Sequence, residues 1–415
     1  MALILSDVTN TLQKVIMPYI RDNFPKQTIL LDQVKRNKGV TFMNDYFYAP
    51  LRTTRHGGVG ILADDDNKLV SGKTEFSQAR VGVKILTGTF DISKLTIDAT
   101  KTAKGAVENQ LTFQAMTLAT DFARSINRQY FSDGVGALCQ AAGSTSATEF
   151  PVELIDSGGI ADDGRLKDYY GTINSDIAPT KYIHKGMVIS VGSASASGLG
   201  TVQSATDGTI LTTGTTGPAD GENVYIVDGD GEGDGSSEIE GLRKAFASAG
   251  GTYANVAQTT YGWQAQFGST SEALTLSRME EKYLAAREYG QQADRYAIFV
   301  NKTLYKKYGD LLTSMRRAVN TTELLGGWTG LEFAAGAGRI GVFLDYDVPD
   351  GECLIVNLDT LTICQVSDLD WLESPNSGAL ARRTDYITYQ ATMVWFTNLL
   401  CLCPAANAKL TRKTD

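Results

Sequence analysis

The chain has 415 residues, 42% of them hydrophobic and 20% charged, which suits a folded protein of two or three compact units and excludes a disordered one. Its net charge of −9 argues against a dedicated DNA-binding protein, which would show a basic face. No apolar run approaches the roughly 18 residues of a membrane span, and the N-terminus lacks a basic signal-peptide start. We therefore expect a soluble protein made in a cytoplasm, with no membrane partner.

The first 90 residues predict an arm followed by a long hairpin. A short amphipathic helix is expected over 9–20, with Leu12 and Ile16 on its apolar side. Residues 51–90 contain the turn sequences GGVG and ADDDNK, and Val81, Val83 and Ile85 alternate with polar or small residues. A hairpin of this kind cannot bury itself, so it must lie on another surface.

A long helix is predicted over 104–130. Apolar residues recur there at spacings of three and four, and Arg128 falls on another face of the helix. Such a helix is about 40 Å long, which suits a spine, and Gly134 in FSDG is a natural terminator. The apolar stripe consists of Val107, Leu111, Ala115, Leu118, Phe122, Ile126 and Tyr130.

The segment 141–237 differs in composition from the rest of the chain. Of the 50 residues in 191–240, 24 are Gly, Ser or Thr, with short β runs between turns. Residues 151–240 hold 15 acidic and four basic side chains, so they carry −11 and leave the remainder at +2. This pattern predicts a small antiparallel barrel or sandwich inserted into a host domain, with an acidic surface.

From residue 238 onward the pattern is α+β. Helices are expected over 274–289 and 302–319, with Asn301 as the N-cap of the second. Strands are expected over 296–301, 339–346, 352–358, 360–366 and 385–396. Helices followed by meandering strands indicate a mixed sheet rather than an alternating βαβ layout.

Motifs for chemistry are weak. Gly336, Gly338 and Gly341 match GxGxxG, but a strand follows where a dinucleotide site needs a helix, so a β-turn is the better interpretation. Asp228, Asp230 and Glu232 open a loop like that of a calcium site, yet position twelve is Ile239. They are weak metal candidates in what we interpret as a solvated acidic linker.

Catalytic and zinc-binding arrangements are not indicated either. The five cysteines lack zinc-site spacing and are expected to be buried free thiols. The two histidines, His56 and His184, suggest no Ser–His or Cys–His arrangement. We expect no enzyme activity and no cofactor.

The order of these parts resembles the major capsid protein of tailed double-stranded-DNA phages. The stretches that carry the resemblance are FYAPLRTTRHGGVG, the passage from FSDG to GDGSSEIEGLRKAF, YAIFVNKTLYKKYGDLLTSMRRAV and LLCLCPAANAKLTRK. Each is weak alone, and their order and spacing carry the inference over all but about 141–237. The resemblance implies an α+β capsid fold with a long spine helix, an extended β-hairpin loop and an inserted β-rich domain.

The resemblance also implies a division of the chain. In that division residues 1–48 would form the N-terminal arm, 49–90 the extended loop, and 91–140 the P-domain with the spine helix. Residues 141–237 would form the insertion, 238–397 the A-domain, and 398–415 the C-terminal return to the P-domain.

Shell assembly is the function that the resemblance implies. Copies would form hexamers and pentamers of an icosahedral shell, assembled in the host cytoplasm, around DNA held by non-specific proximity. Scaffolding, portal or decoration proteins are possible partners. Some capsids of this family join subunits by a lysine–asparagine isopeptide bond; Lys68 and Lys73 lie in the extended loop, but the sequence shows no partner for them. The residues expected to act in assembly are Leu12, Ile16, Arg55, Gly57, Gly58, Lys68 and Lys73.

Three rival interpretations stay open. An encapsulin-type compartment shares the fold and holds cargo enzyme instead of DNA, although the long insertion argues against that shorter class of chain. An enzyme with a β-rich accessory domain is supported only by the weak motifs above. A β-rich adhesin or tail component would explain 141–237 but not the spine helix and arm.

Overall fold

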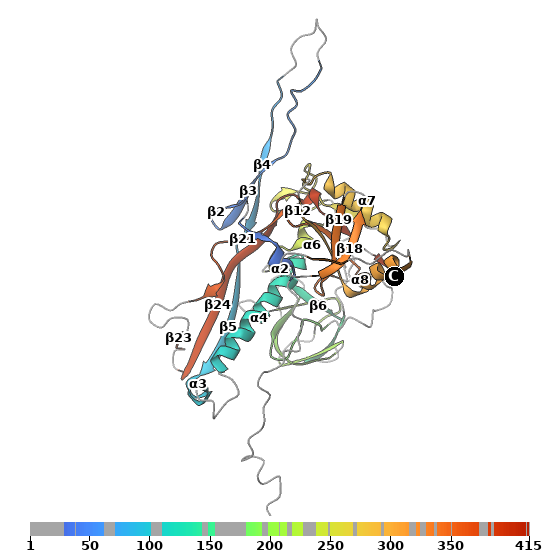
Figure 1. Cartoon of the computed structure of the whole chain (residues 1–415). Helices are drawn as coiled ribbons and strands as arrows, with labels where there is room; N and C mark the ends of the chain where they lie inside the picture. The colour runs from blue at the N-terminus through green and yellow to red at the C-terminus, as the bar shows by residue number, and fades with distance from the viewer. Residues whose placement is uncertain are drawn as a thin grey trace, which may run out of the picture. The chain divides into compact units, whose positions relative to one another are not determined.

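A computed structural model of the chain describes most residues beyond the N-terminal arm. The described ranges are 29–37, 39–61, 71–100, 110–142, 148–153, 180–192, 198–206, 208–213, 218–226, 238–247, 250–268, 272–291, 294–314, 321–323, 329–335, 338–349, 351–372, 381–382, 386–411 and 413–414. The fold is mixed α/β, mostly sheet with few helices (Figure 1). The helix expected over 9–20 lies outside these residues. None of the helices in these ranges is long and apolar enough to cross a membrane.

The chain forms two compact units. The first comprises Met1–Lys26, Leu86–Arg124 and Leu369–Trp395, and the second comprises Gln27–Ile85, Ser125–Asp368 and Phe396–Asp415. Three elements belong in part to each unit: strand β5 (Lys84–Ser93), the 22-residue helix α4 (Gln110–Phe131) and the 14-residue strand β24 (Thr388–Cys401).

The first unit is built on the N-terminal half of β24. Strands β5 (Lys84–Ser93), β22 (Asp370–Trp371) and β23 (Ala381–Arg382) pair with it, and α3 (Lys94–Thr100) follows β5. The strand β5 has Gly88 where a Cβ would lie 3.1 Å from Leu118 and 3.2 Å from Phe122 of α4. A residue without a side chain therefore lets this strand and helix pack closely. Phe90 meets Trp371 edge-on at 6.0 Å between ring centroids.

The second unit contains a seven-stranded mixed sheet in the order β14-β25-β20-β16-β19-β18-β17. The pairs β16–β19 and β14–β25 are parallel and the others are antiparallel, as the run of helices and strands predicted. Its strands are β14 (Gln266–Gly268), β16 (Tyr296–Val300), β17 (Thr321–Glu323), β18 (Thr329–Ala335), β19 (Gly338–Leu344), β20 (Cys353–Asn357) and β25 (Ala408–Leu410).

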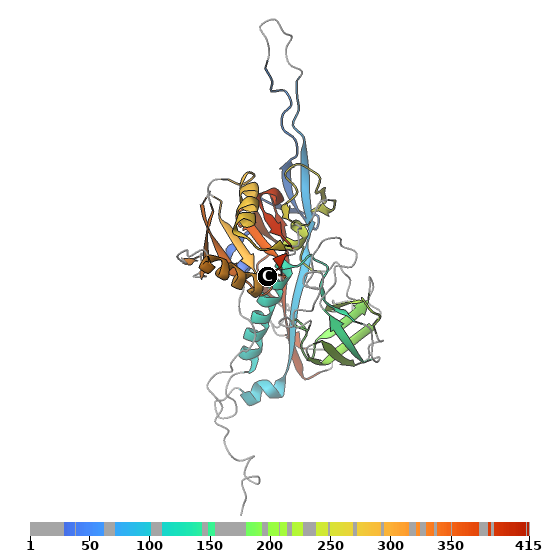
Figure 2. The same ribbon diagram turned by 90° about the vertical axis from the view of Figure 1, so that its right-hand side faces the viewer.

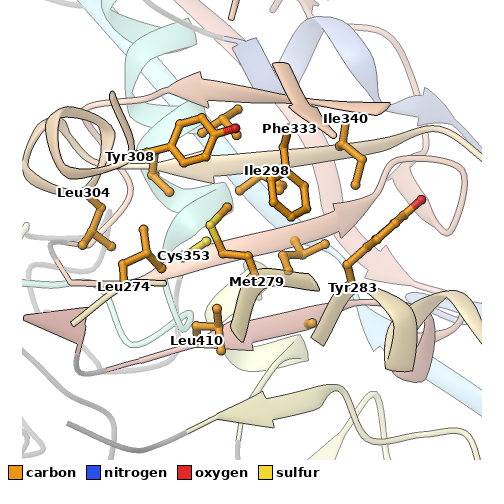
Figure 3. Close-up of a cluster of buried hydrophobic side chains, with 14 of the residues drawn as sticks. Leu274, Met279, Tyr283, Ile298, Leu304, Tyr308, Phe333, Ile340, Cys353 and Leu410 are labelled. Carbon is orange, nitrogen blue, oxygen red and sulfur yellow. The ribbon is translucent and has the colours of Figure 1, made fainter. Parts of the chain in front are cut away.

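Apolar side chains fill both faces of this sheet. Helices α7 (Leu276–Arg287) and α8 (Lys302–Ser314) cover one face, and their apolar side chains join those of the sheet in one buried cluster (Figure 3). Thr275 caps α7, and the Asn301 side chain accepts the Lys302 N–H at the start of α8. On the other face Phe299 of β16 meets Phe131 at the end of α4, with ring centroids 5.9 Å apart. Burial on both faces explains the continuous apolar run of β20.

A smaller set of strands surrounds the second half of β24. Strand β21 (Leu361–Gln365) pairs with β24 on one side and, in parallel, with β1 (Lys35–Arg36) on the other. A three-stranded sheet follows in the order β2 (Thr41–Met43), β3 (Tyr46–Arg52), β4 (Phe76–Gly82). The short elements are α2 (Ile29–Gln33), α6 (Leu242–Ala245), β12 (Thr252–Tyr253), β13 (Val256–Ala257), β15 (Glu272–Ala273), η1 (Pro404–Ala406) and β26 (Lys413–Thr414).

The glycine- and threonine-rich segment forms a closed antiparallel barrel in the order β10-β7-β6-β11-β8-β9, drawn in green in Figure 2. Gly208, with φ +91°, lies in the turn between β9 and β10, a conformation that favours glycine. Apolar side chains such as Phe150, Ile189 and Ile210 fill the interior. The strands are β6 (Ala137–Ala141), β7 (Glu149–Glu153), β8 (Val188–Gly192), β9 (Gly198–Thr206), β10 (Thr209–Thr213) and β11 (Asn223–Ile226).

Several sequence expectations differ from the structure. Arg128 was expected on a face away from the apolar stripe, but it is only 9% exposed because Glu238 pairs with it. The hairpin was expected from residue 51, yet its first strand begins at Tyr46 and its second ends at Gly82. Residues 408–410 form β25, which pairs with β20 in the seven-stranded sheet.

The cysteines are free thiols. Cys139, Cys353, Cys364 and Cys401 are buried and Cys403 is half-buried. Burial raises the pKa of Cys364 and of Cys401 to about 12. These thiols are therefore protonated packing groups rather than nucleophiles.

Candidate assembly surfaces

The hairpin β3–β4 is the described part of the segment that the sequence connected with assembly. Its strands pair from Tyr46↔Gly82 to Arg52↔Phe76, and beyond them the Thr53 N–H donates to the Glu75 carbonyl at 3.0 Å. Alternate side chains such as Phe47 and Val81 are buried. Those on the opposite side face solvent, as alternation in a strand requires.

Three glycines meet farther along the hairpin. A Cβ on Gly72 would lie 2.2 Å from the Gly58 nitrogen and 2.5 Å from the Gly57 carbonyl carbon. A Cβ on Gly58 would lie 2.8 Å from the Gly72 nitrogen, whereas one on Gly57 would meet nothing within 4 Å. The two arms therefore touch backbone to backbone, and Gly58 and Gly72 are required there.

Arg55 connects the hairpin to a loop before α7. Its guanidinium donates to the Tyr261 hydroxyl at 3.2 Å and lies 5.8 Å from the centre of that ring. Tyr261 in turn packs on Tyr289, with ring centroids 6.0 Å apart. A cation over an aromatic face at this distance is attracted to it, so Arg55 holds the hairpin against the loop that contains Tyr261.

The other expected assembly residues are placed only in part. Lys73 is exposed and forms an ion pair with Glu75 at 3.0 Å. Lys68, Leu12 and Ile16 lie outside the described residues, so the arm and the loop tip stay predictions.

The candidate metal loop with Asp228, Asp230 and Glu232 also lies outside the described residues. Within the described ranges no cluster of three or more His, Cys, Asp or Glu side chains is arranged to hold a metal ion. Gly338 and Gly341 lie in β19, which pairs antiparallel with β18, so the GxGxxG match stands before a strand rather than a helix.

Large apolar side chains are exposed on both units. In the hairpin, Val59 is 86% and Ile61 98% exposed. A monomeric protein seldom leaves groups of such side chains in water, so these are candidate contact surfaces. Further examples are Phe42, Met43, Tyr46 and Phe76 around the hairpin and Leu95, Met116, Leu372, Tyr386 and Ile387 in the first unit.

Two contacts of the hairpin were not foreseen from the sequence: that of Gly72 with Gly57 and Gly58, and that of Tyr261 with Arg55. Gly72 stands in VSGKTEF and Tyr261 in TTYGWQ, and nothing local marks either as a partner of the hairpin. The glycines on both arms of the predicted hairpin are the sequence signal that could have indicated the Gly72 contact.

The sequence matches no protein-family model, and no curated protein is significantly similar to it. Solved structures are similar over nearly the whole chain. A chain of the cyanophage A-1(L) capsid asymmetric unit superposes with a TM-score of 0.56 and 15% identity, covering 98% of this chain and 98% of that one. The capsid of a native GTA particle superposes with a TM-score of 0.50 and 11% identity, covering 98% and 96%.

The chain has the tailed-phage major capsid fold. Both superpositions cover more of the chain than the three quarters in which the sequence resemblance lies. The encapsulin complex SrpI from Synechococcus elongatus superposes with a TM-score of 0.48 and 8% identity, covering 100% of this chain and 96% of that one.

Proposed function

We propose that this protein is a structural major capsid protein of a tailed phage, which assembles into the hexamers and pentamers of an icosahedral shell around double-stranded DNA. In this proposal α4 is the spine helix, β3–β4 the extended loop, the barrel an inserted domain and the seven-stranded sheet the core of the A-domain. The protein is not an enzyme, and its place is the virion.

The exposed apolar side chains of the hairpin support the proposal most directly. Val59, Ile61 and Phe76 are bare in the single chain, and burial in a neighbouring copy would remove them from water. A shared fold does not by itself establish a function, since one fold can serve several functions. The capsid fold together with an apolar hairpin that lacks its own cover favours assembly over a monomeric role.

Imaging of the purified protein tests the proposal. We expect negative-stain electron microscopy and light scattering near neutral pH to show closed shells or rings of five and six subunits. Nuclease-protected DNA inside would select the phage capsid, and enclosed protein without DNA would select an encapsulin-like compartment. A monodisperse monomer or dimer, even after co-expression with a scaffolding protein, would contradict a shell role.

The glycine contact in the hairpin gives a matched pair of variants. Gly72→Ala forces the arms apart because its Cβ would overlap the Gly57–Gly58 backbone, whereas Gly57→Ala places its Cβ in open space. We expect Gly72→Ala to lower the yield of assembled particles about tenfold or more and Gly57→Ala to leave it near wild type. Particle yield by sedimentation measures this, and equal yields from the two variants would contradict it.

A further inference from the structure

One loop of the barrel contacts the turn after β19. The Lys181 ammonium donates to the Tyr346 carbonyl and lies 3.8 Å from the Asp347 carboxylate. The Tyr182 hydroxyl donates to the same carboxylate at 3.0 Å. These are side-chain contacts between two parts of the second unit that the chain connects only distantly.

Two carboxyl groups lie side by side under this loop. The Asn127 amide nitrogen is 3.3 Å from one oxygen of Asp345 and 2.8 Å from one oxygen of Asp347. The Asp347 N–H also donates to Asp345 at 2.9 Å. Asp345 is only 1% exposed, so its charge has almost no access to water.

Three cationic side chains lie around the carboxyl pair and its loop. Arg128 at the end of α4 forms two hydrogen bonds with Glu238 and stacks on Tyr182 at 5.7 Å. Lys181 pairs with Asp347, and Lys302 at the start of α8 repels the Lys181 ammonium. The described hydrogen bonds of Asp345 come from neutral donors, the Asn127 amide and the Asp347 N–H, and the Asp347 carboxylate lies beside it. Ionised Asp345 therefore adds a negative charge that one bound proton would remove.

We infer that Asp345 and Asp347 form a proton-operated clamp for the barrel. With one proton on the pair, the Lys181–Tyr182 loop closes over two carboxyl groups that carry a single charge. Without the proton, closing the loop buries two adjacent negative charges and is less favourable. The inference concerns one chain and does not depend on the proposed shell role.

The direction of the pH effect follows from the buried carboxyl. Burial, and then the charge of Asp347, raise the pKa of Asp345 to about 7, while the Asp347 N–H, Asn127 and Lys181 lower it by less. Opening the loop would admit water and return this pKa toward its ordinary value near 4. The closed state therefore binds the proton more tightly, so closure is favoured in acid and lost as the pH rises through about 7.

Hydrogen–deuterium exchange of the full-length protein tests the clamp. Ile183 and Met187 donate backbone N–H groups to Thr180 and His184 within the loop, so peptides over 180–192 report its opening. After correction for the intrinsic pH dependence of exchange, we expect protection to be about tenfold higher near pH 6 than near pH 8.5. Equal corrected protection at the two pH values would refute the clamp.

Three variants separate the clamp from a general pH effect. Asp345→Asn mimics the protonated acid, so protection should be high and independent of pH. Tyr182→Phe removes one contact without changing any charge on the pair, so protection should fall at both pH values with the pH ratio retained. Asp220→Asn, at an exposed position of the same barrel, should behave as wild type. A wild-type pH ratio in Asp345→Asn would overturn the inference, whether or not the protein forms shells.

Discussion

Gly241→Ala is expected to lower the free energy of unfolding by about 3 kcal/mol or more and to reduce the soluble yield. A Cβ at this position would lie 2.3 Å from the Gln129 carbonyl oxygen, 2.4 Å from that of Ser132 and 2.6 Å from that of Tyr130. All three are backbone atoms at the end of α4. The overlap therefore cannot be relieved by rotating a side chain.

The surroundings of Gly241 leave little freedom to shift. Its carbonyl accepts hydrogen bonds from the backbone N–H groups of Lys244 and Ala245 in α6, and the Ile239 N–H donates to the Gln129 side chain at 3.2 Å. Its φ of −77° is ordinary, so the requirement for glycine comes from space alone.

Gly309→Ala is the matched control for this prediction. Gly309 lies in α8, where an added Cβ meets nothing within 4 Å, so alanine should be neutral or stabilise by roughly 0.5–1 kcal/mol through its higher helix propensity. Urea unfolding of the purified chains, followed by circular dichroism, gives both values. Equal midpoints for wild type and Gly241→Ala would contradict the predicted overlap.

Local pattern predicted the periodic parts of the fold well. The apolar stripe of the long helix placed Phe122, Ile126 and Tyr130 correctly, because a spacing of three and four puts such residues on one side of a helix. The alternating and continuous apolar runs likewise identified β20 and β21, which are buried in their sheets. Periodicity reports which side of an element is covered, and here it did.

Contacts between distant segments could not be predicted in this way. Arg128 reads as a solvent-facing position, and its partner Glu238 is 110 residues away. The sequence FLDYDVP reads as a strand end in an exposed turn, yet Tyr182, 165 residues earlier, covers Asp347. Both assignments depend on where the inserted segment folds back, which no local spacing encodes.

The residues expected to act in assembly show the same difference between local sequence pattern and contacts with distant segments. Gly58 was singled out as part of a glycine-rich turn, but its reason is the backbone of Gly72 on the other arm. Arg55 was singled out with it, and its partner Tyr261 lies 206 residues away. The structure thus shows a contact within the chain for Gly58 and for Arg55, and the role of these residues in assembly stays a prediction.

A buried carboxylate with two cations gives the second large expected effect. The same Glu352 oxygen lies 3.2 Å from Nε of Arg243 in α6 and 3.3 Å from Nζ of Lys409 in β25. The Glu352 and Lys409 side chains are fully buried, and that of Arg243 is 8% exposed. Helix α6, strand β25 and the residue just before β20 therefore meet at one buried carboxylate.

Glu352→Gln is expected to destabilise the protein by about 3–5 kcal/mol, because it takes from two buried cations the carboxylate that they share. Asp368→Asn is the control: its pair with Arg36, at 2.9 Å, is exposed on both sides and should contribute little. The double variant Glu352→Gln with Lys409→Met should recover part of the loss, since it also removes one of the buried cations. Urea unfolding measures all three, and a Glu352→Gln midpoint equal to that of Asp368→Asn would show that the buried cluster does not hold these elements together.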